Sequence, residues 1–343
     1  MKKFFFFLIS LLIGIALFFW ILNTVGWQEV RKILFNFSGR NSLIILFLTM
    51  LIWLVGLWKW KFVLNSQGCN YPFMGLLQIA FASNAVTYLL SPTALFGGEG
   101  FRVYALRKKF SAPWDKNLAA VIIEKLLSAS MALIFLILGV LSFLFLNQSI
   151  SRNLAIISIV IIGGLTMILA TFYFKSFKKE SIFKLIFRFF GKEMKNGTVT
   201  EGVEKEIFNF FEFNKKTMWQ GMAIAFLRYF LIFVRCWILI FFLKRETSIL
   251  IALAVMFFLY LAYSFPLPAG MGALDTAQAF AFGTFNLGQA TGITFSFILR
   301  GAEIIISLIG IIFLIKLGIE IFSGNIKNFF QKITSNQKNG GNQ

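Results

Sequence analysis

Charged side chains stand inside or at the edges of long apolar runs in this sequence. A charge within a membrane bundle is costly unless it meets water or an opposite charge, so such residues mark functional sites. Arginine binds phosphate through charge-assisted hydrogen bonds, and carboxylates balance arginines or contact cationic headgroups. The pattern predicts a polar cavity that holds a lipid headgroup. The charged candidates are Glu99, Arg102, Glu124, Lys125, Arg228, Arg235, Asp275 and Arg300.

Spacing along the chain suggests partners for some of these charges. Glu99 lies three residues before Arg102, so the two side chains share a face if the segment is helical. Arg300 and Glu303 have the same spacing, and we expect them to neutralise each other. Such charges fit two roles, which are holding a ligand and fixing helix packing as neutral pairs.

Two further arginines, Arg228 and Arg235, are seven residues apart and therefore lie on one helix face. No acid is close to either of them in the sequence. Their spacing favours a distant partner or a ligand over a local ion pair.

Two backbone breaks carry carboxylates of this set. The first reads PTALFGGE over residues 92–99, and the second reads PLPAGMGALD over residues 266–275. Each has proline, then glycine, then an acid. Glycine-rich breaks expose backbone N–H groups that can face an anion. From these breaks we take Gly97, Gly98, Pro268, Gly270 and Gly272 as candidate substrate-binding positions.

Long apolar helices must position these residues. The chain of 343 residues is 58% hydrophobic and 14% charged, and apolar runs of membrane-spanning length recur from end to end. We expect an all-α polytopic membrane protein with about six full spans and two re-entrant hairpins at 72–96 and 248–285. The expected spans are 4–25, 43–64, 118–146, 154–174, 218–243 and 289–317.

Loop charge sets the expected topology. Lysine and arginine gather at both termini and at 59–61, 101–117 and 175–217, so all of these belong on the cytoplasmic side. Segment 72–96 must then enter and leave on that side, whereas 248–285 enters and leaves on the other. Paired interrupted segments of opposite orientation are typical of an inverted repeat in a transporter. We expect Lys59 and Lys61 to snorkel to the interface.

The polar segments fit one integral domain with a tail. We assign residues 1–325 to the membrane domain, in which 175–217 forms a basic amphipathic loop on the inner membrane face. An alternative is that this loop is a solvated connector. The polar, low-complexity end at 326–343 is expected to be disordered.

Several function classes are excluded or disfavoured. The chain has no histidine, which removes histidine bases and histidine metal sites, and Cys69 and Cys236 match no metal or redox spacing. We expect no metal, no cofactor and no nucleotide-binding P-loop. The net charge of +19 fits basic loops beside anionic lipids, so we expect membrane lipids and not nucleic acid as partners.

The sequence resembles a known family at these motifs. GGEGFRVYAL, the Glu124–Lys125 pair and PLPAGMGALD with a final helix carrying Arg300 are similar to the flippase-like membrane region of lysylphosphatidylglycerol synthases, the multiple peptide resistance factor family. The similarity covers about residues 5 to 320. Three positions depart from its pattern: Ala269 replaces a glycine, Asp275 a glutamate and Lys125 an arginine.

The resemblance implies a stand-alone member in the bacterial inner membrane that transfers a lipid between leaflets. The fused members carry an aminoacyltransferase domain after this region, and this chain shows none, so we expect no aminoacylation of lipid by this chain. The leading hypothesis is a translocase for an anionic or zwitterionic phospholipid or a lipid-linked precursor. Two alternatives are a membrane-embedded lipid-modifying enzyme and a non-transporting partner of an envelope enzyme. A homo-oligomer is also compatible with the sequence.

Overall fold

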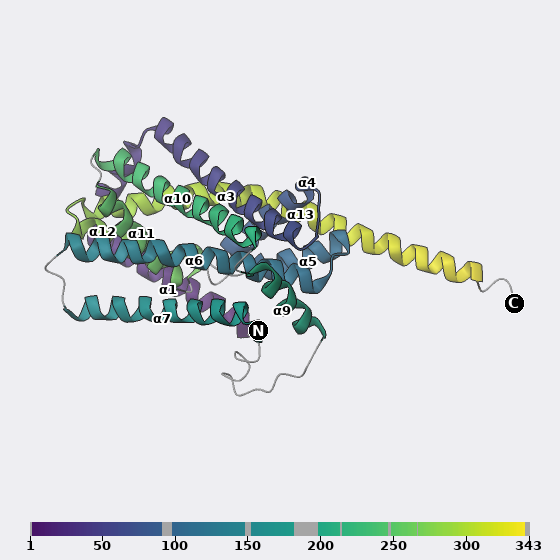
Figure 1. Cartoon of the computed structure of the whole chain (residues 1–343). Helices are drawn as coiled ribbons and strands as arrows, with labels where there is room; N and C mark the ends of the chain where they lie inside the picture. Colours follow the sequence, from purple (N-terminus) through teal and green to yellow (C-terminus); the bar gives the residue numbers. More distant parts are fainter. Residues whose placement is uncertain are drawn as a thin grey trace.

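The fold is a bundle of helices (Figure 1). The structure is a computed structural model, and it describes residues 2–90, 98–147, 152–181, 198–212, 215–245, 248–265 and 267–339. All regular secondary structure in these ranges is helical, which confirms the predicted all-α class.

Four helices are long and apolar enough to cross a membrane. They are α3 (Gly39–Ser66), α6 (Trp114–Leu146), α10 (Lys216–Lys244) and the Gln289–Ile319 part of α13 (Gln289–Asn339). Shorter apolar stretches lie in α1 (Lys2–Val25), α7 (Arg152–Phe177) and α11 (Ile249–Ser264). These helices confirm a multi-pass membrane protein, whereas the count of six spans stays a prediction. The predicted boundary between the membrane domain and the tail at residue 325 also stays a prediction. Helix α13 continues past this residue to Asn339.

Two helical hairpins contain the predicted breaks. The first joins α4 (Phe73–Ala85), the π-helical turn η1 (Val86–Leu90) and α5 (Gly98–Phe110), and the second joins α11, the 3-10 turn η2 (Pro268–Gly270) and α12 (Ala273–Thr284). The arms of each hairpin contact each other. The longest arm, α4 together with η1, has 13 and 5 residues and reaches ~27 Å at most, which is shorter than a ~30 Å hydrocarbon core.

Two stretches predicted as loops are partly helical. The basic segment predicted as a loop at 101–117 contains most of α5 and the start of α6. The stretch between the expected spans 4–25 and 43–64 contains α2 (Trp27–Phe35). Because both helical stretches are polar, a search for apolar runs does not detect them. Among the predicted break residues, Pro92, Gly97 and Pro266 lie outside the described part of the chain.

The helix order repeats once along the chain. Helices α3, α4, α5 and α6 begin at Gly39, Phe73, Gly98 and Trp114, and α10, α11, α12 and α13 begin at Lys216, Ile249, Ala273 and Gln289. Each start in the first set therefore recurs in the second at a nearly constant distance along the chain, which we call the repeat offset. In Figure 1, α3 runs towards the right and α10 towards the left, and α6 and α13 also run in opposite directions. The helix order thus recurs with reversed directions, and the inverted repeat of a transporter stays a prediction with which this arrangement is compatible.

The two repeated sets of helices, α3–α6 and α10–α13, pack on each other at glycines. Helix α4 packs on α13, and α11 packs on α6. A Cβ built on Gly310 of α13 would overlap the Phe81 carbonyl oxygen of α4, and one on Gly139 of α6 would lie 2.6 Å from the Leu253 carbonyl oxygen of α11. These backbones can approach so closely only because glycine has no side chain, a common device in membrane helix packing.

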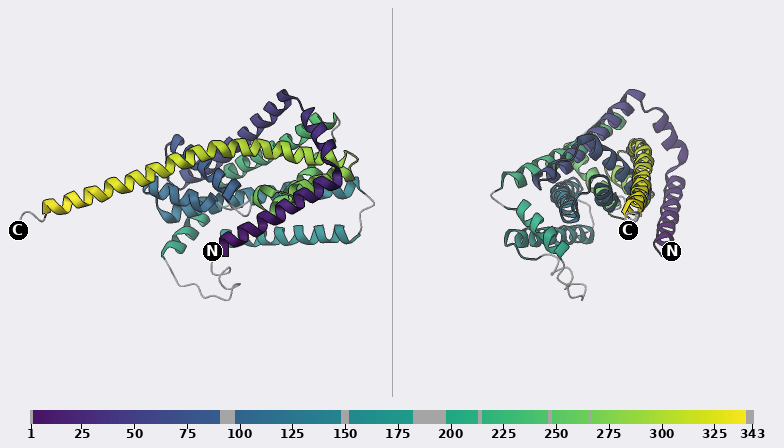
Figure 2. Two further views of the ribbon diagram at one scale, coloured as in Figure 1. Left: turned by 180° about the vertical axis from the view of Figure 1, so that it is seen from behind. Right: turned by 90° about the vertical axis from the view of Figure 1, so that its right-hand side faces the viewer.

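Helices α1 and α7 lie on the outside of the bundle (Figure 2). A further helix, α9 (Thr198–Phe210), packs on α6. It lies at the same end of the bundle as α5 (Figure 1), and because the basic segments 101–117 and 175–217 contribute these helices, we call this the Lys/Arg-rich end. Its buried residues Val203, Ile207 and Phe210 recur every three or four positions, so its apolar face meets the protein core. Residues 182–197 of the predicted amphipathic loop at 175–217 lie outside the described ranges.

Candidate functional site

A buried carboxylate, Glu124, holds two cations from other helices. The Arg102 guanidinium of α5 donates to Glu124 Oε2 at 2.7 Å, and Lys59 Nζ of α3 lies 3.5 Å from Glu124 Oε1. Lys59 also donates to the Ser128 hydroxyl one turn along α6. Arg102 lies against the Trp60 ring as well, 5.0 Å from its centroid. Three helices thus meet at one carboxylate.

The position of Lys59 corrects the sequence prediction that it snorkels to the interface. Its side chain is fully buried, and it faces the bundle instead of the lipid surface. A signal for this was present in the sequence. Lys59 follows Thr49, Ile52 and Gly56 at spacings of three and four, which places it on the inward face of α3.

The neighbouring ion pair joins Glu99 to Lys125. Glu99 Oε1 lies 2.5 Å from Lys125 Nζ, so the acid at the first break reaches α6. The predicted local pairing of Glu99 with Arg102 is therefore replaced by two pairs between helices, Glu99 with Lys125 and Arg102 with Glu124. Glu124 and Lys125, which are adjacent in α6, therefore each pair with one residue of α5.

Arg228 of α10 completes this group. Its side chain passes Gly56, where a built Cβ would lie 3.2 Å from Arg228 Nε. Its charge acts on both Lys59 and Glu124. The Nε atom is buried without a hydrogen-bond partner, and Arg228 forms no ion pair within the described ranges.

We call these six residues the basic cluster. Its members are Lys59, Arg102, Lys125 and Arg228 as cations and Glu99 and Glu124 as anions. Four cations and two carboxylates leave a formal excess of two positive charges. Such an excess inside a bundle is stabilised by an anionic ligand or by water.

The first residue described after the first break, Gly98, is hydrogen-bonded to α4 and η1. The Ser83 hydroxyl donates to the Gly98 carbonyl at 2.9 Å, and the Gly98 N–H donates to Thr87 Oγ1 at 2.9 Å. Arg102 Nε donates to the same Ser83 hydroxyl at 3.1 Å. A Cβ built on Gly98 would overlap the Ser83 carbonyl oxygen, so only glycine fits there.

Replacing Gly98 by alanine is expected to destabilise the protein by about 1–3 kcal/mol, because the methyl group forces α5 away from α4. Gly100→Ala is the matched control, since nothing lies within 4 Å of a Cβ at Gly100. The free energies of unfolding of the two variants in detergent should differ clearly. Equal values would show that the close approach at Gly98 is not required.

A second charged group lies in the other half, and we call it the paired cluster. Asp275 Oδ2 accepts from Arg300 Nη2 at 2.9 Å and from the Gly272 N–H at 3.1 Å, so Asp275 also caps the start of α12. Gly272 has φ of +76°, which favours glycine. Arg235 Nη1 lies 3.0 Å from Glu303 Oε1.

These contacts correct the predicted pairing of Arg300 with Glu303. Each residue takes a partner from another helix, Asp275 of α12 for Arg300 and Arg235 of α10 for Glu303. The four charges balance. Arg235 also donates to the Thr49 hydroxyl of α3 at 3.0 Å, so α3 contributes a side chain to each cluster.

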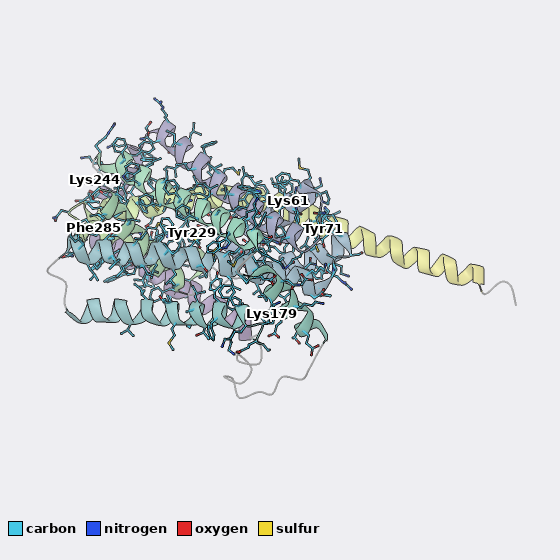
Figure 3. All side chains as sticks on the ribbon, viewed as in Figure 1. Lys61, Tyr71, Lys179, Tyr229, Lys244 and Phe285 are labelled. Carbon is cyan, nitrogen blue, oxygen red and sulfur yellow. The ribbon has the colours of Figure 1, made fainter. Side chains whose placement is uncertain are left out.

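The sequence candidates therefore divide into two groups that share the centre of the bundle. The turns η1 and η2 of the two breaks contact each other, which brings Pro268 and Gly270 beside the first hairpin. In Figure 3, Lys244 and Phe285 mark one end of the bundle, Tyr71, Lys61 and Lys179 mark the other, and Tyr229 lies between them. Arg228, which precedes Tyr229, is ~18 Å along α10 from its first residue.

Other polar features lie apart from these clusters. A cavity of about 250 Å³ lies between α3, α9 and α10, and none of the predicted site residues lines it. Within the described ranges, no three aspartate, glutamate or cysteine side chains gather as a metal site.

Comparison with known proteins gives the family. The model of the lysylphosphatidylglycerol synthase TM region matches residues 7–310, most of the chain. The chain belongs to this family. It is also similar to a UPF0104 membrane protein of Methanocaldococcus jannaschii, with 23% identity over 294 residues, which covers 81% of this chain and 85% of that protein.

As a member of the lysylphosphatidylglycerol synthase TM family, the chain keeps charge at two positions where its residues depart from the motif pattern. Lys125 stands where arginine is common and still pairs with Glu99. Asp275 stands where glutamate is usual and still reaches Arg300 while it caps α12. The departures shorten a side chain or remove a bidentate donor, but each ion pair forms.

Proposed function

We propose that this protein is a lipid translocase that moves a phospholipid or lipid-linked precursor with an anionic headgroup between the leaflets of the membrane. The observation that carries the proposal is the formal charge excess of the basic cluster. Arg228 is its cation without an ion-pair partner in the described structure. A phosphate group would supply the missing negative charge.

The chemistry of the basic cluster suits a phosphate. Arg228 and Arg102 offer planar donor groups, and Lys59 offers a compact ammonium beside them. Glu124 holds Arg102 and Lys59 in place when no ligand is bound. The cluster is also not sealed by protein, because the Lys125 side chain is 37% exposed and that of Arg102 is 20% exposed.

Depth in the bundle supports translocation over simple surface binding. Glu124 lies ~15 Å along α6 from its first residue, well inside a helix long enough to span. A headgroup that reaches this position has left the interface while its acyl chains can stay in the bilayer. The protein would thereby lower the cost of carrying a charge through the hydrocarbon core.

The orientation follows from loop charge. We place the end that carries Lys61, Lys179 and the C-terminal part of α13 in the cytoplasm of a bacterial cell, with both termini on that side. The basic cluster then opens towards the cytoplasm. The first hairpin would enter the membrane from that side and the second from the opposite side.

The direct test measures leaflet exchange in vesicles. The purified protein is reconstituted with a fluorescently labelled phosphatidylglycerol, and an impermeant reductant quenches the outer-leaflet dye. With the protein we expect a second phase of quenching as inner-leaflet lipid moves outward. Identical traces with and without the protein would refute the proposal. Labelled phosphatidylcholine reports headgroup preference, and a slower phase is expected for it.

A further inference from the structure

The ion pairs of the two clusters recur at the same repeat offset as the helices. Glu99 and Lys125 form the first pair, and Asp275 and Arg300, at the equivalent positions of the second half, form the second. Both pairs join the short helix after a break to the long helix that follows it. The match therefore extends from helix order to individual side chains.

A second set of contacts repeats as well. Lys59 of α3 recurs at the repeat offset as Arg235 of α10, and both are buried cations. Lys59 donates to Ser128 of α6, and Arg235 donates to Glu303, which stands at the matching position of α13. Each half thus builds the same arrangement, with a buried cation bound to the long helix and an acid–base pair at the break.

The two halves differ in how far the protein covers these pairs. In the first pair the Lys125 and Glu99 side chains are 37% and 19% exposed, whereas in the second pair those of Arg300 and Asp275 are 10% and 0% exposed. Two halves of opposite orientation that hold the same contacts in unlike environments can interchange their conformations, as in other transporters with inverted repeats.

We infer that Glu99–Lys125 and Asp275–Arg300 are the two gates of the charged core, recorded here with the first open to the Lys/Arg-rich end and the second closed. In the alternate state the Glu99–Lys125 pair is buried, and the Asp275–Arg300 pair is hydrated from the opposite end. The inference rests on the proposed translocation, since gates matter only if a ligand passes between them.

The contact between the breaks gives the gates a way to act together. The turns η1 and η2 contact each other, so a shift of one hairpin changes the packing of the other. The hydroxyl of Tyr88 in η1 is buried without a hydrogen-bond partner in the described structure, and so is Asp275 Oδ1. Unpaired buried polar atoms make the closed second gate easier to leave.

The test compares one cysteine at equivalent positions of each gate. Cys69 and Cys236 are first replaced by alanine, and then Gly100→Cys and Thr276→Cys, which match each other at the repeat offset, are made separately. An impermeant maleimide is applied from either side of sealed vesicles. In the parent background we expect fast labelling at position 100 from the Lys/Arg-rich end and slow labelling at position 276.

Breaking the second gate should shift the equilibrium. Arg300→Gln leaves the fully buried Asp275 without a cation, which favours the state in which water reaches this carboxylate. Labelling at position 276 from the opposite end should rise at least about tenfold, because an unpaired buried charge disfavours the closed state by more than that factor. Labelling at position 100 should fall. The double variant Asp275→Asn with Arg300→Gln has no unpaired charge and should return towards the parent rates.

A second variant keeps the test decisive if Arg300→Gln folds poorly. Lys125→Gln leaves Glu99, which prefers the hydrated state recorded here, so labelling at position 276 should fall further. Unchanged labelling in both variants, or an Arg300→Gln rise from the Lys/Arg-rich end, would overturn the gate assignment. Labelling reports gates without any lipid. Gates that move in a protein without leaflet exchange would therefore overturn only the proposed transport function.

Discussion

Replacing Glu124 by glutamine is expected to destabilise the protein by about 3–5 kcal/mol, the usual cost of breaking a buried ion pair from one side. Lys59 is fully buried and Arg102 is mostly covered, and both lose their carboxylate in this variant. Glutamine keeps nearly the same shape and can accept one hydrogen bond, so the loss reports charge and not volume. The free energy of unfolding in mixed detergent micelles, followed by tryptophan fluorescence, measures it.

Two controls separate the burial of this pair from the removal of a charge in general. Glu180→Gln removes the acid of the exposed Lys175–Glu180 pair and should leave the free energy of unfolding unchanged, since solvent screens such pairs. Combining Lys59→Met with Glu124→Gln removes the buried ammonium as well and should recover part of the loss. If Glu180→Gln destabilises the protein as much as Glu124→Gln, the buried pair has no special role.

The long helices and the breaks between them could be predicted from the sequence. Apolar runs of spanning length led directly to α3, α6, α10 and α13, and their ends lie close to the expected ones, except at the end of α13. The breaks were visible because proline and glycine interrupt apolar segments. Loop charge also predicts that the two hairpins enter the membrane from opposite sides, and this orientation stays a prediction.

The ion-pair partners could not be predicted, because sequence spacing reports only local neighbours. The three-residue rule suggested Arg300 with Glu303, but their inward-facing helix surface meets other helices that offer Asp275 and Arg235. For buried charges, tertiary geometry and full desolvation outweigh a weak surface pairing. Only packing reveals which acid lies opposite which base.

The prediction for Lys59 was wrong because it rested on the neighbouring residue types and not on the helix face. Next to Trp58, Trp60 and Lys61 it fits an interfacial belt, and near the end of a span a lysine can reach the headgroups. Its helical phase was the better guide, because α3 turns Lys59 inward and Trp58 outward. The recurrence of Lys59 as Arg235 could be recognised only after the helix starts had revealed the repeat offset.

Replacing Arg228 by glutamine is expected to slow leaflet exchange of labelled phosphatidylglycerol at least about tenfold while the protein stays folded. A hydrogen bond between charged groups contributes about 1.5–3 kcal/mol, and about 1.4 kcal/mol corresponds to a factor of ten. Arg228 has no ion pair within the described ranges, so its loss leaves no carboxylate unpaired. Function and stability should therefore separate at this position, unlike at Glu124.

Two further variants identify what Arg228 contributes. Arg228→Lys keeps the charge but loses the planar donor group, so it should retain part of the exchange rate. Lys216→Gln removes an exposed cation from the start of the same helix and should leave the rate unchanged. If Arg228→Gln exchanges lipid at the parent rate, the headgroup does not bind at the basic cluster, and the charge excess there has a structural cause. If all three variants slow exchange equally, general surface charge and not Arg228 attracts the lipid.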